Sequence, residues 1–376
     1  MPHAAIPLSM LLVFSMSMTG CINPHRISGP VHDAKGPAYI AQPSPASLAP
    51  IALNHRLLLI GDAGLFLEDD PTLAKLADWS QDAAATTVIF LGDNIYNEGL
   101  VDDDRARGEK ILAQQLAATS ARKILVPGNH DWGLFQMRES SIQNQQAFVA
   151  EWADGQAEFL PADGCVGPAI RQVYAGSAGK AVTLVLVDPS PIILENPDLG
   201  CAGDNDLDAH IAALDRALEH HRDDWVLVAS HYPLETGGPH GGLSYGSLLV
   251  DGILNIVRFW AGGAGDTYDT AYAAWIDETT RVMRKNQPEL YAAGHDHNLQ
   301  VLSGHDYVGT EIVSGAGAVE RVTSVTHLPS TLFAHAVPGF VAIDFGRRND
   351  ADVAILRIIE TDADAPVFEM ELPAPH

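Results

Sequence analysis

The chain has 376 residues, of which 47% are hydrophobic and 19% are charged. This composition is ordinary for a globular protein, and it excludes an intrinsically disordered chain and a multi-span membrane protein. Acidic residues outnumber basic residues 48 to 22, which gives a formal net charge of -26. Long-range repulsion therefore argues against a nucleic-acid polymer as a partner. A small anionic substrate stays compatible with this charge, because a metal ion inverts the sign of the local field.

The N-terminus has the features of an export signal. An apolar stretch from Leu8 to about Met18 is followed by small residues and Cys21, and its length suits a signal peptide better than a membrane span. The ending MTGC resembles the lipobox of bacterial lipoproteins, although the preceding segment has neither Lys nor Arg. We expect a lipoprotein-type signal peptide over residues 1–20 and an exported protein of the bacterial cell envelope. It would face the periplasm or the exterior, with a membrane anchor at Cys21 if that residue is processed.

Residues 21–54 are rich in proline and carry no sustained apolar periodicity. Such a segment is typical of a tether. No second linker follows, so the sequence predicts one folded domain over residues 55–376.

The only cysteines after Cys21 are Cys165 and Cys201. An even pair in an exported chain suggests a disulfide bond between them. The alternative is two unrelated thiols.

From residue 55 onward, short apolar runs alternate with helical patterns. The runs RLLLI, TTVIFL and KILVP predict buried strands, with helices over Pro71–Ser80 and about Arg105–Leu116 between them. Apolar residues at helical spacing predict a further helix; they are Leu207, Ile211, Leu214 and Leu218. Another helix is predicted from about Tyr268 to Lys285, and strands dominate the sequence after it. The pattern predicts an α/β fold with a β-rich end.

Polar residues gather at the carboxyl ends of the predicted strands, which is the edge where layered α/β folds bind ligands. The motifs are GDAG (Asp62), GDNIY (Asp93, Tyr96), GNHDW (Asn129, His130, Asp131), ASHYP (His231) and AAGHDHN (His295, His297). A single Gly-Asp motif is most often only a turn, whereas five successive strand ends that supply oxygen and imidazole donors predict a metal site. Donors without a thiolate suit Zn, Fe or Mn, and their number indicates two ions that share a carboxylate.

In order and content these motifs resemble those of calcineurin-like metallophosphoesterases, and more narrowly those of purple acid phosphatases of the tartrate-resistant type. Most metallophosphoesterases begin with Asp-x-His, whereas this chain has Asp62, Ala63 and Gly64. The next motif supplies Tyr96 three residues after Asp93, as in purple acid phosphatases. The missing histidine and the additional phenol thus occur together. The resemblance implies an α/β fold in the form of a four-layer α/β/β/α sandwich with a single catalytic domain.

The resemblance also implies a role for each residue. Asp62, Tyr96 and His297 would hold Fe(III), Asn129, His231 and His295 would hold a divalent Fe, Zn or Mn, and Asp93 would bridge the two ions. His130, oriented by Asp131, and His240, nine residues after His231, would face the substrate.

The implied activity is hydrolysis of phosphate monoesters by a metal-bound hydroxide. One alternative is a phosphodiesterase that acts on nucleotide or phospholipid-derived diesters with the same site. Another is a non-catalytic envelope protein that retains the metal ions. The oligomeric state is not indicated by the sequence.

Other interpretations apply to some of these residues taken singly. A tyrosine after a strand is usually a core phenol, but the absent histidine at positions 63 and 64 favours a ligand role for Tyr96. The i, i+2 spacing of His295 and His297 directs both side chains to one side of an extended segment. The apolar stretch ILNIVRFW, residues 253–260, is interpreted as a helix over the core, with a lid or a membrane contact as alternatives.

Overall fold

The computed structural model describes residues 31–32, 36–41 and 48–372, except 135, 154, 177–178, 204, 242–265 and 268. The predicted signal peptide, Cys21 and the apolar stretch 253–260 lie outside these residues. Within the described ranges, the structure has no helix that is both long enough and apolar enough to cross a membrane.

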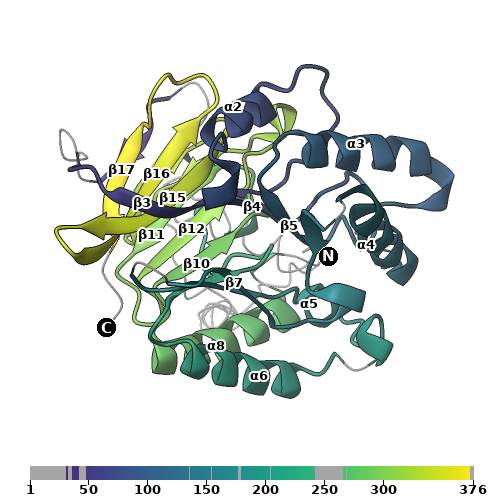
Figure 1. Ribbon diagram of the computed structural model, residues 1–376. Coiled ribbons are helices and arrows are strands. Elements are labelled where there is room, and N and C mark those ends of the chain that lie inside the picture. Colours follow the sequence, from purple (N-terminus) through teal and green to yellow (C-terminus); the bar gives the residue numbers. More distant parts are fainter. Residues whose placement is uncertain are drawn as a thin grey trace, which may run out of the picture.

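Two β-sheets form the centre of the molecule (Figure 1). The first sheet has eight strands in the order β2-β14-β11-β12-β10-β9-β8-β7, and the second has seven in the order β17-β16-β15-β3-β4-β5-β6. The strands of the first sheet are β2 (Tyr39–Ile40), β7 (Ala169–Tyr174), β8 (Val182–Leu186), β9 (Trp225–Ala229), β10 (Leu290–Ala293), β11 (Leu299–Ser303), β12 (Thr310–Ser314) and β14 (Thr331–His335). Those of the second are β3 (Ala52–Ile60), β4 (Thr86–Leu91), β5 (Arg122–Val126), β6 (Ala157–Phe159), β15 (Gly339–Arg348), β16 (Ala351–Glu360) and β17 (Phe368–Leu372).

Helices cover the outer face of each sheet (Figure 1). The seven-stranded sheet packs against α2 (Pro71–Trp79), α3 (Arg105–Ala117) and α4 (Glu139–Ala153), and the eight-stranded sheet packs against α5 (Ser190–Ile193), α6 (Leu207–His220) and α8 (Thr270–Asn286). Alternation along β3 explains the layers, since Leu57 and Leu59 enter the core between the sheets while Leu58 and Ile60 face the helices. The predicted four-layer α/β/β/α sandwich is confirmed.

An aspartate side chain caps the start of two of the predicted helices. Asp70 accepts hydrogen bonds from the backbone N–H groups of Thr72 and Leu73, and Pro71 occupies the first turn of α2. Asp206 caps α6 in the same way. The apolar stripe on α6 is buried against the eight-stranded sheet. Local capping and periodicity therefore account for these two helices.

Some residues of the segment expected to be a tether form strands. Within residues 21–54, β1 (Val31–His32) pairs with β13 (Val325–Thr326), β2 pairs with β14, and β3 begins at Ala52. Pairing at a sheet edge uses backbone hydrogen bonds and needs no apolar periodicity, so the sequence pattern did not indicate these strands.

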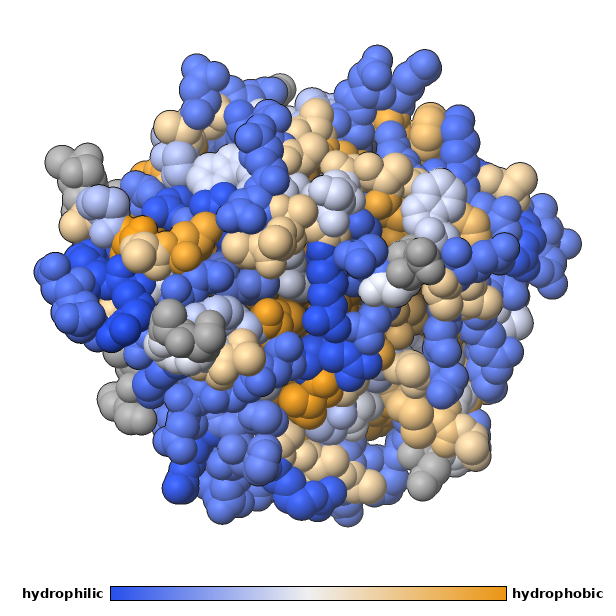
Figure 2. All heavy atoms as spheres, in the orientation of Figure 1, coloured by the Kyte–Doolittle hydropathy of each residue, from blue (hydrophilic) through white to orange (hydrophobic). Residues whose placement is uncertain are grey.

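The face shown in Figure 2 is mainly hydrophilic, and its hydrophobic groups form small separate patches.

The disulfide between Cys165 and Cys201 is present, with the two Cα atoms 4.4 Å apart. It joins the 3-10 turn Ala162–Gly164 to the turn Cys201–Gly203 across 36 residues of sequence. The predicted pairing is therefore confirmed.

Candidate metal centre

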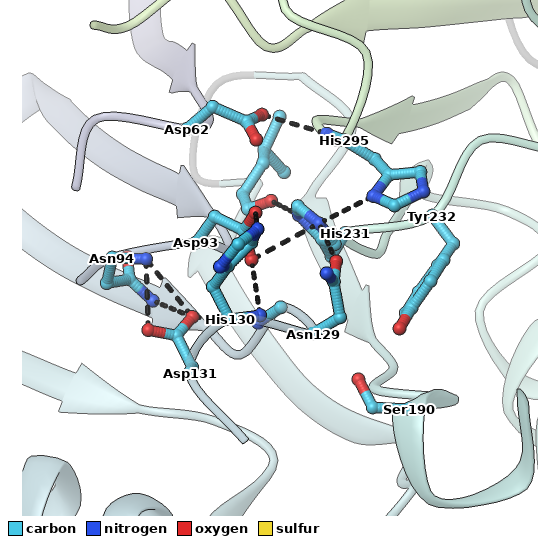
Figure 3. A network of polar contacts seen from close by, with 12 residues as sticks. Asp62, Asp93, Asn94, Asn129, His130, Asp131, Ser190, His231, Tyr232 and His295 are labelled. Carbon is cyan, nitrogen blue, oxygen red and sulfur yellow. Dashed lines mark hydrogen bonds and ion pairs between the residues drawn. The ribbon is translucent and has the colours of Figure 1, made fainter. Parts of the chain in front are cut away.

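The parallel strands of the two sheets bring the predicted motifs to one edge of the sandwich. In the seven-stranded sheet, β3, β4 and β5 run parallel, and Asp62, Asp93 and Asn129 follow their carboxyl ends. In the eight-stranded sheet, β9 and β10 run parallel and are followed by His231 and His295. Both sheets thus direct polar residues to a common site (Figure 3).

A first group of donors consists of Asp62, Tyr96 and His297. The Tyr96 hydroxyl donates a hydrogen bond of 2.7 Å to Asp62 Oδ1 and lies 3.1 Å from His297 Nε2. The distance from His297 Nε2 to Asp62 Oδ1 is 3.3 Å. Two oxygen atoms and one nitrogen atom therefore converge, which is the arrangement that the sequence predicts for these three residues.

A second group consists of Asn129, His231 and His295. His231 Nε2 lies 3.0 Å from Asn129 Oδ1 and 3.0 Å from His295 Nδ1. Figure 3 shows these side chains facing one another. All three residues are buried. Buried polar groups require partners or an ion, so this cluster is also suited to a cation.

Asp93 lies between the two groups. Its carboxylate and the donor atoms of Asp62 and His297 all lie within 4.8 Å of one another, a spacing that could hold a metal ion. On the other side, Asp93 Oδ1 lies 3.4 Å from His231 Nε2. The structure therefore brings all seven predicted ligands together, with Asp93 shared.

Backbone carbonyl groups determine which ring nitrogen of His231 and of His297 faces the cluster. His231 Nδ1 lies 2.8 Å from the carbonyl oxygen of Leu91, and His297 Nδ1 lies 2.8 Å from that of Arg321. A carbonyl only accepts, so each Nδ1 carries the hydrogen and each Nε2 directs a lone pair into the cluster. The two imidazoles are thus oriented as metal ligands are.

The backbone around the centre is strained. Asp62, Asp93 and His295 have positive φ values of 59°, 53° and 68°, a conformation that residues other than glycine adopt at a cost. Gly92 also has a positive φ, and a Cβ atom there would lie 2.5 Å from His231 Nδ1. Tight turns that non-glycine residues tolerate poorly therefore place these carboxylates and imidazoles.

The electrostatics of the centre fit a cation. Burial opposes ionisation of Asp93, but His231 and His130 outweigh it and lower the pKa of Asp93 below its ordinary value. Burial, Asp62 and Asp93 together raise the pKa of Tyr96 well above its ordinary value. A cation beside the phenol would offset these effects, because its positive charge stabilises the phenolate and so lowers the pKa of Tyr96. The donor set therefore fits a metal ion.

His130 and Asp131 adopt a different relationship from the one predicted. His130 Nδ1 donates to the carbonyl oxygen of Asn97 at 2.6 Å, and the His130 backbone N–H donates to Asp93 Oδ1 at 2.9 Å. Asp131 instead accepts hydrogen bonds from the backbone N–H groups of Asn94 and Gly128. The prediction that Asp131 orients His130 is wrong, because the Asp131 carboxylate is fully engaged in holding the two metal-motif loops together (Figure 3).

His240 lies against the second group of donors. Its ring stacks on His295 with 3.8 Å between the ring centroids, and its Nδ1 lies 2.9 Å from Asp266 Oδ1. Sequence reasoning found His240 from its offset but missed Asp266. In the sequence Asp266 follows the glycine-rich stretch AGGAG and not an apolar run, so the strand-end pattern that revealed the other residues does not reach it.

A buried carboxylate holds the loop between His231 and His240. Glu311 of β12 accepts hydrogen bonds from the backbone N–H groups of Leu234 and Glu235. Burial raises the pKa of Glu311 to about 8. Glu311 was not predicted either, because it lies within an apolar strand and carries no motif.

Arg321 is a further residue that the motifs did not reveal. Its guanidinium Cζ lies 3.7 Å from the centroid of the Tyr96 ring. Arg321 follows β12 and the glycine-rich turn after it. This is the same strand-end signal that revealed the ligands, so the pattern could have found Arg321 had it been applied to β12.

Comparison with known proteins agrees with this geometry. Residues 55–299 match the profile of the calcineurin-like phosphoesterase family. Purple acid phosphatase 17 of Arabidopsis thaliana is 23% identical over 281 residues, which cover 71% of this chain and 69% of that protein. Tartrate-resistant acid phosphatase type 5 of Homo sapiens is 24% identical over 253 residues, which cover 65% of this chain and 64% of that protein.

Solved structures share the fold. GAP50, described as the anchor in the inner membrane complex of Plasmodium, has a TM-score of 0.56 at 14% identity, over 85% of this chain and 89% of that chain. A purple acid phosphatase from seeds of yellow lupin, Lupinus luteus, has a TM-score of 0.53 at 12% identity, over 84% of this chain and 53% of that chain. Because the family profile covers more than half of the sequence, this chain belongs to the calcineurin-like phosphoesterase family.

Proposed function

We propose that this protein is a dinuclear metal-dependent phosphatase that hydrolyses phosphate monoesters. The observation that carries the proposal is the position of Asp93, whose carboxylate lies beside two separate donor groups. The purple acid phosphatases among its relatives support the same reaction class.

In this proposal Asp62, Tyr96 and His297 would hold Fe(III), because a phenolate and a carboxylate are hard donors that suit a trivalent ion. Asn129, His231 and His295 would hold a divalent Fe, Zn or Mn, and Asp93 would be shared by the two sites. When bound, the two ions would activate a water molecule and neutralise charge on the phosphoryl group.

The histidines outside the two donor groups would act on the substrate. His130 is held by Asn97 through Nδ1, and in its protonated form its Nε2 would donate a hydrogen bond to a phosphoryl oxygen. His240 is held by Asp266 in the same manner, and its Nε2 could protonate the leaving alkoxide. Neither residue needs to form a covalent bond, since phosphoryl transfer depends mainly on positioning and electrostatics.

The cellular location forms part of the proposal. The N-terminal apolar stretch and the MTGC sequence support export to the bacterial cell envelope with a lipid anchor at Cys21. Labelling with radioactive palmitate, in wild type and Cys21→Ser, tests the anchor: label in the wild type alone is expected, and no label in either protein would contradict it.

Hydrolysis of an aryl phosphate monoester and of the matching diester by the metal-loaded protein tests the activity. We expect kcat/KM to be larger for the monoester and to fall at least 1000-fold in Asp93→Asn, roughly the scale of losing a bridging ligand and its ion. Asp215→Asn, which changes a partly exposed carboxylate on α6 that pairs with Lys285, is the matched control and should retain full activity. A larger kcat/KM for the diester would contradict the monoester assignment, and no turnover of either ester would contradict the enzymatic function.

A further inference from the structure

Arg321 places a positive charge at the edge of the candidate metal centre. Its guanidinium lies over the face of Tyr96, and the Tyr96 hydroxyl contacts both Asp62 and His297. A cation on an aromatic face is attracted to the ring, so this contact holds the guanidinium beside the first donor group.

The backbone of Arg321 is fixed to the same group. Its carbonyl oxygen accepts the hydrogen bond from His297 Nδ1, and the N–H of Thr323 donates to the carbonyl oxygen of His297 at 2.9 Å. Earlier in the same segment, the N–H of Gly317 donates to the carbonyl oxygen of Gly61, next to Asp62. The position of Arg321 is therefore set by the residues that flank the centre.

Arg321 is not neutralised by a carboxylate. Among the described residues, no ion pair within 4.0 Å includes Arg321, and its buried Nε has no hydrogen-bond partner. Other half-buried arginines of this chain are paired; Arg56 and Arg357, for example, both contact Asp344. An unpaired buried donor is costly, and acidic partners are abundant in a chain of net charge -26. The free donor atoms of Arg321 therefore indicate an anionic ligand that is shared with the centre.

We propose that Arg321 binds an oxygen atom of the phosphoryl group in the substrate and in the phosphate product. This inference rests on the proposed phosphatase function and adds a recognition residue to it. The planar guanidinium can donate two parallel hydrogen bonds to a phosphate, and its attachment to Tyr96 and His297 keeps it within the site before the substrate arrives. Arg321 thus acts on substrate and product affinity.

Calorimetric titration of the metal-loaded protein with inorganic phosphate tests the proposal without requiring turnover. Loss of a charge-assisted hydrogen bond should weaken phosphate binding about 10- to 100-fold in Arg321→Gln. The loss should be smaller in Arg321→Lys, which keeps the positive charge but lacks the two parallel donors of the guanidinium. Arg281→Ala is the matched control, because Arg281 is an exposed arginine of α8 that pairs with Glu278. It should bind phosphate as the wild type does.

The variants are compared at equal metal content, measured for each sample. Unchanged phosphate affinity in Arg321→Gln would overturn the proposal. If Arg321→Gln does not retain its metal ions, Arg321→Lys decides, since unchanged affinity there would show that the guanidinium fork makes no contact. Wild-type protein that binds phosphate through Arg321 but hydrolyses no ester would overturn the phosphatase function while leaving this inference intact.

Discussion

The hydroxyl of Tyr96 donates a 2.7 Å hydrogen bond to Asp62, a residue 34 positions earlier in the chain. Asp62 belongs to the strand-end motif that lacks the histidine usual in related sequences, and Tyr96 belongs to the next motif. The turn after β3 provides Asp62 but no histidine for the first donor group. The turn after β4 provides Tyr96 to that group instead.

Replacement of Tyr96 by phenylalanine should remove the visible absorption of the iron-loaded protein. The band would arise from charge transfer between the phenolate and Fe(III), so the wild type should be coloured. Tyr272→Phe is the control, because Tyr272 is equally buried but donates to the carbonyl oxygen of Pro233. A wild type without colour, or a Tyr96→Phe variant with equally intense colour, would contradict the assignment of Tyr96 as an iron ligand.

Removal of the Asp266 carboxylate should move the pH–rate profile. Burial lowers the pKa of His240, but the hydrogen bond that its Nδ1 donates to Asp266 and the charge of Asp296 outweigh it, so the pKa lies above its ordinary value. Asp266→Asn would therefore lower that pKa, and the protonated imidazole would be lost at a lower pH. We expect the alkaline limb of kcat to shift to lower pH, with kcat reduced about 10-fold, whereas His240→Asn should lose about 100-fold.

The control for this profile is Asp208→Asn, which changes an acidic residue in the first turn of α6 away from the centre. Its pH–rate profile should match that of the wild type. An alkaline limb in Asp266→Asn that coincides with the wild-type limb would show that Asp266 does not set the protonation of His240.

Reduction of the disulfide should destabilise the domain without altering its metal ligands. Opening a loop with a sequence separation of 36 residues should lower the free energy of unfolding by about 3–4 kcal/mol. Cys165→Ser and Cys201→Ser should each show this loss in chemical denaturation, and the double variant should show no additional loss. Alkylation of two thiols in unreduced protein, detected by mass spectrometry, would mean that the bond does not form.

Stability should fall with rising pH because of Glu311. Its pKa rises in the folded protein from an ordinary 4.5 to about 8, so the folded state binds the proton more tightly than the unfolded state does. This contribution to the free energy of unfolding is fully present below pH 4.5 and is lost as the pH rises toward 8. A shift of this size corresponds to about 5 kcal/mol of stability, at roughly 1.4 kcal/mol per pKa unit.

Glu311→Gln should flatten this part of the stability curve, because the amide stays neutral and still accepts from the N–H of Leu234. Chemical denaturation of both proteins across this pH range measures the difference. Parallel curves for wild type and Glu311→Gln would mean that Glu311 titrates alike in the folded and unfolded states.

Much of the fold follows from local patterns in the sequence. Helices α2 and α6 combine an aspartate cap with apolar spacing, and the parallel strands are short apolar runs that precede glycine. Helix α4 was missed because polar residues fill most of its sequence, ESSIQNQQAFVAEWA, and its apolar residues form no strong stripe. Strands β7 and β8 were missed with it, since β7 is only partly buried and carries charged and polar side chains.

The candidate ligands in the centre were predictable because each one follows a strand and adjoins a tight turn. The groups that contact Nδ1 of His130 and of His240 were not. Asn97 acts on His130 through its backbone carbonyl, which any residue possesses and no sequence motif records. Asp266 reaches His240 from 26 positions away through a tertiary contact, which no local pattern in the sequence records.

The proposed ligands come from both sheets, and neither sheet carries a complete set. The turns after β3, β4 and β5 provide four of the seven donors, and the turns after β9 and β10 provide the other three. Each bound ion would therefore cross-link the two halves of the sandwich at one rim. Because such an ion binds only the assembled form, chelation should lower the melting temperature of the wild type. Without the ions, the two sheets should begin to separate at that rim, and amide hydrogen exchange should accelerate first in the turns after β4 and β9.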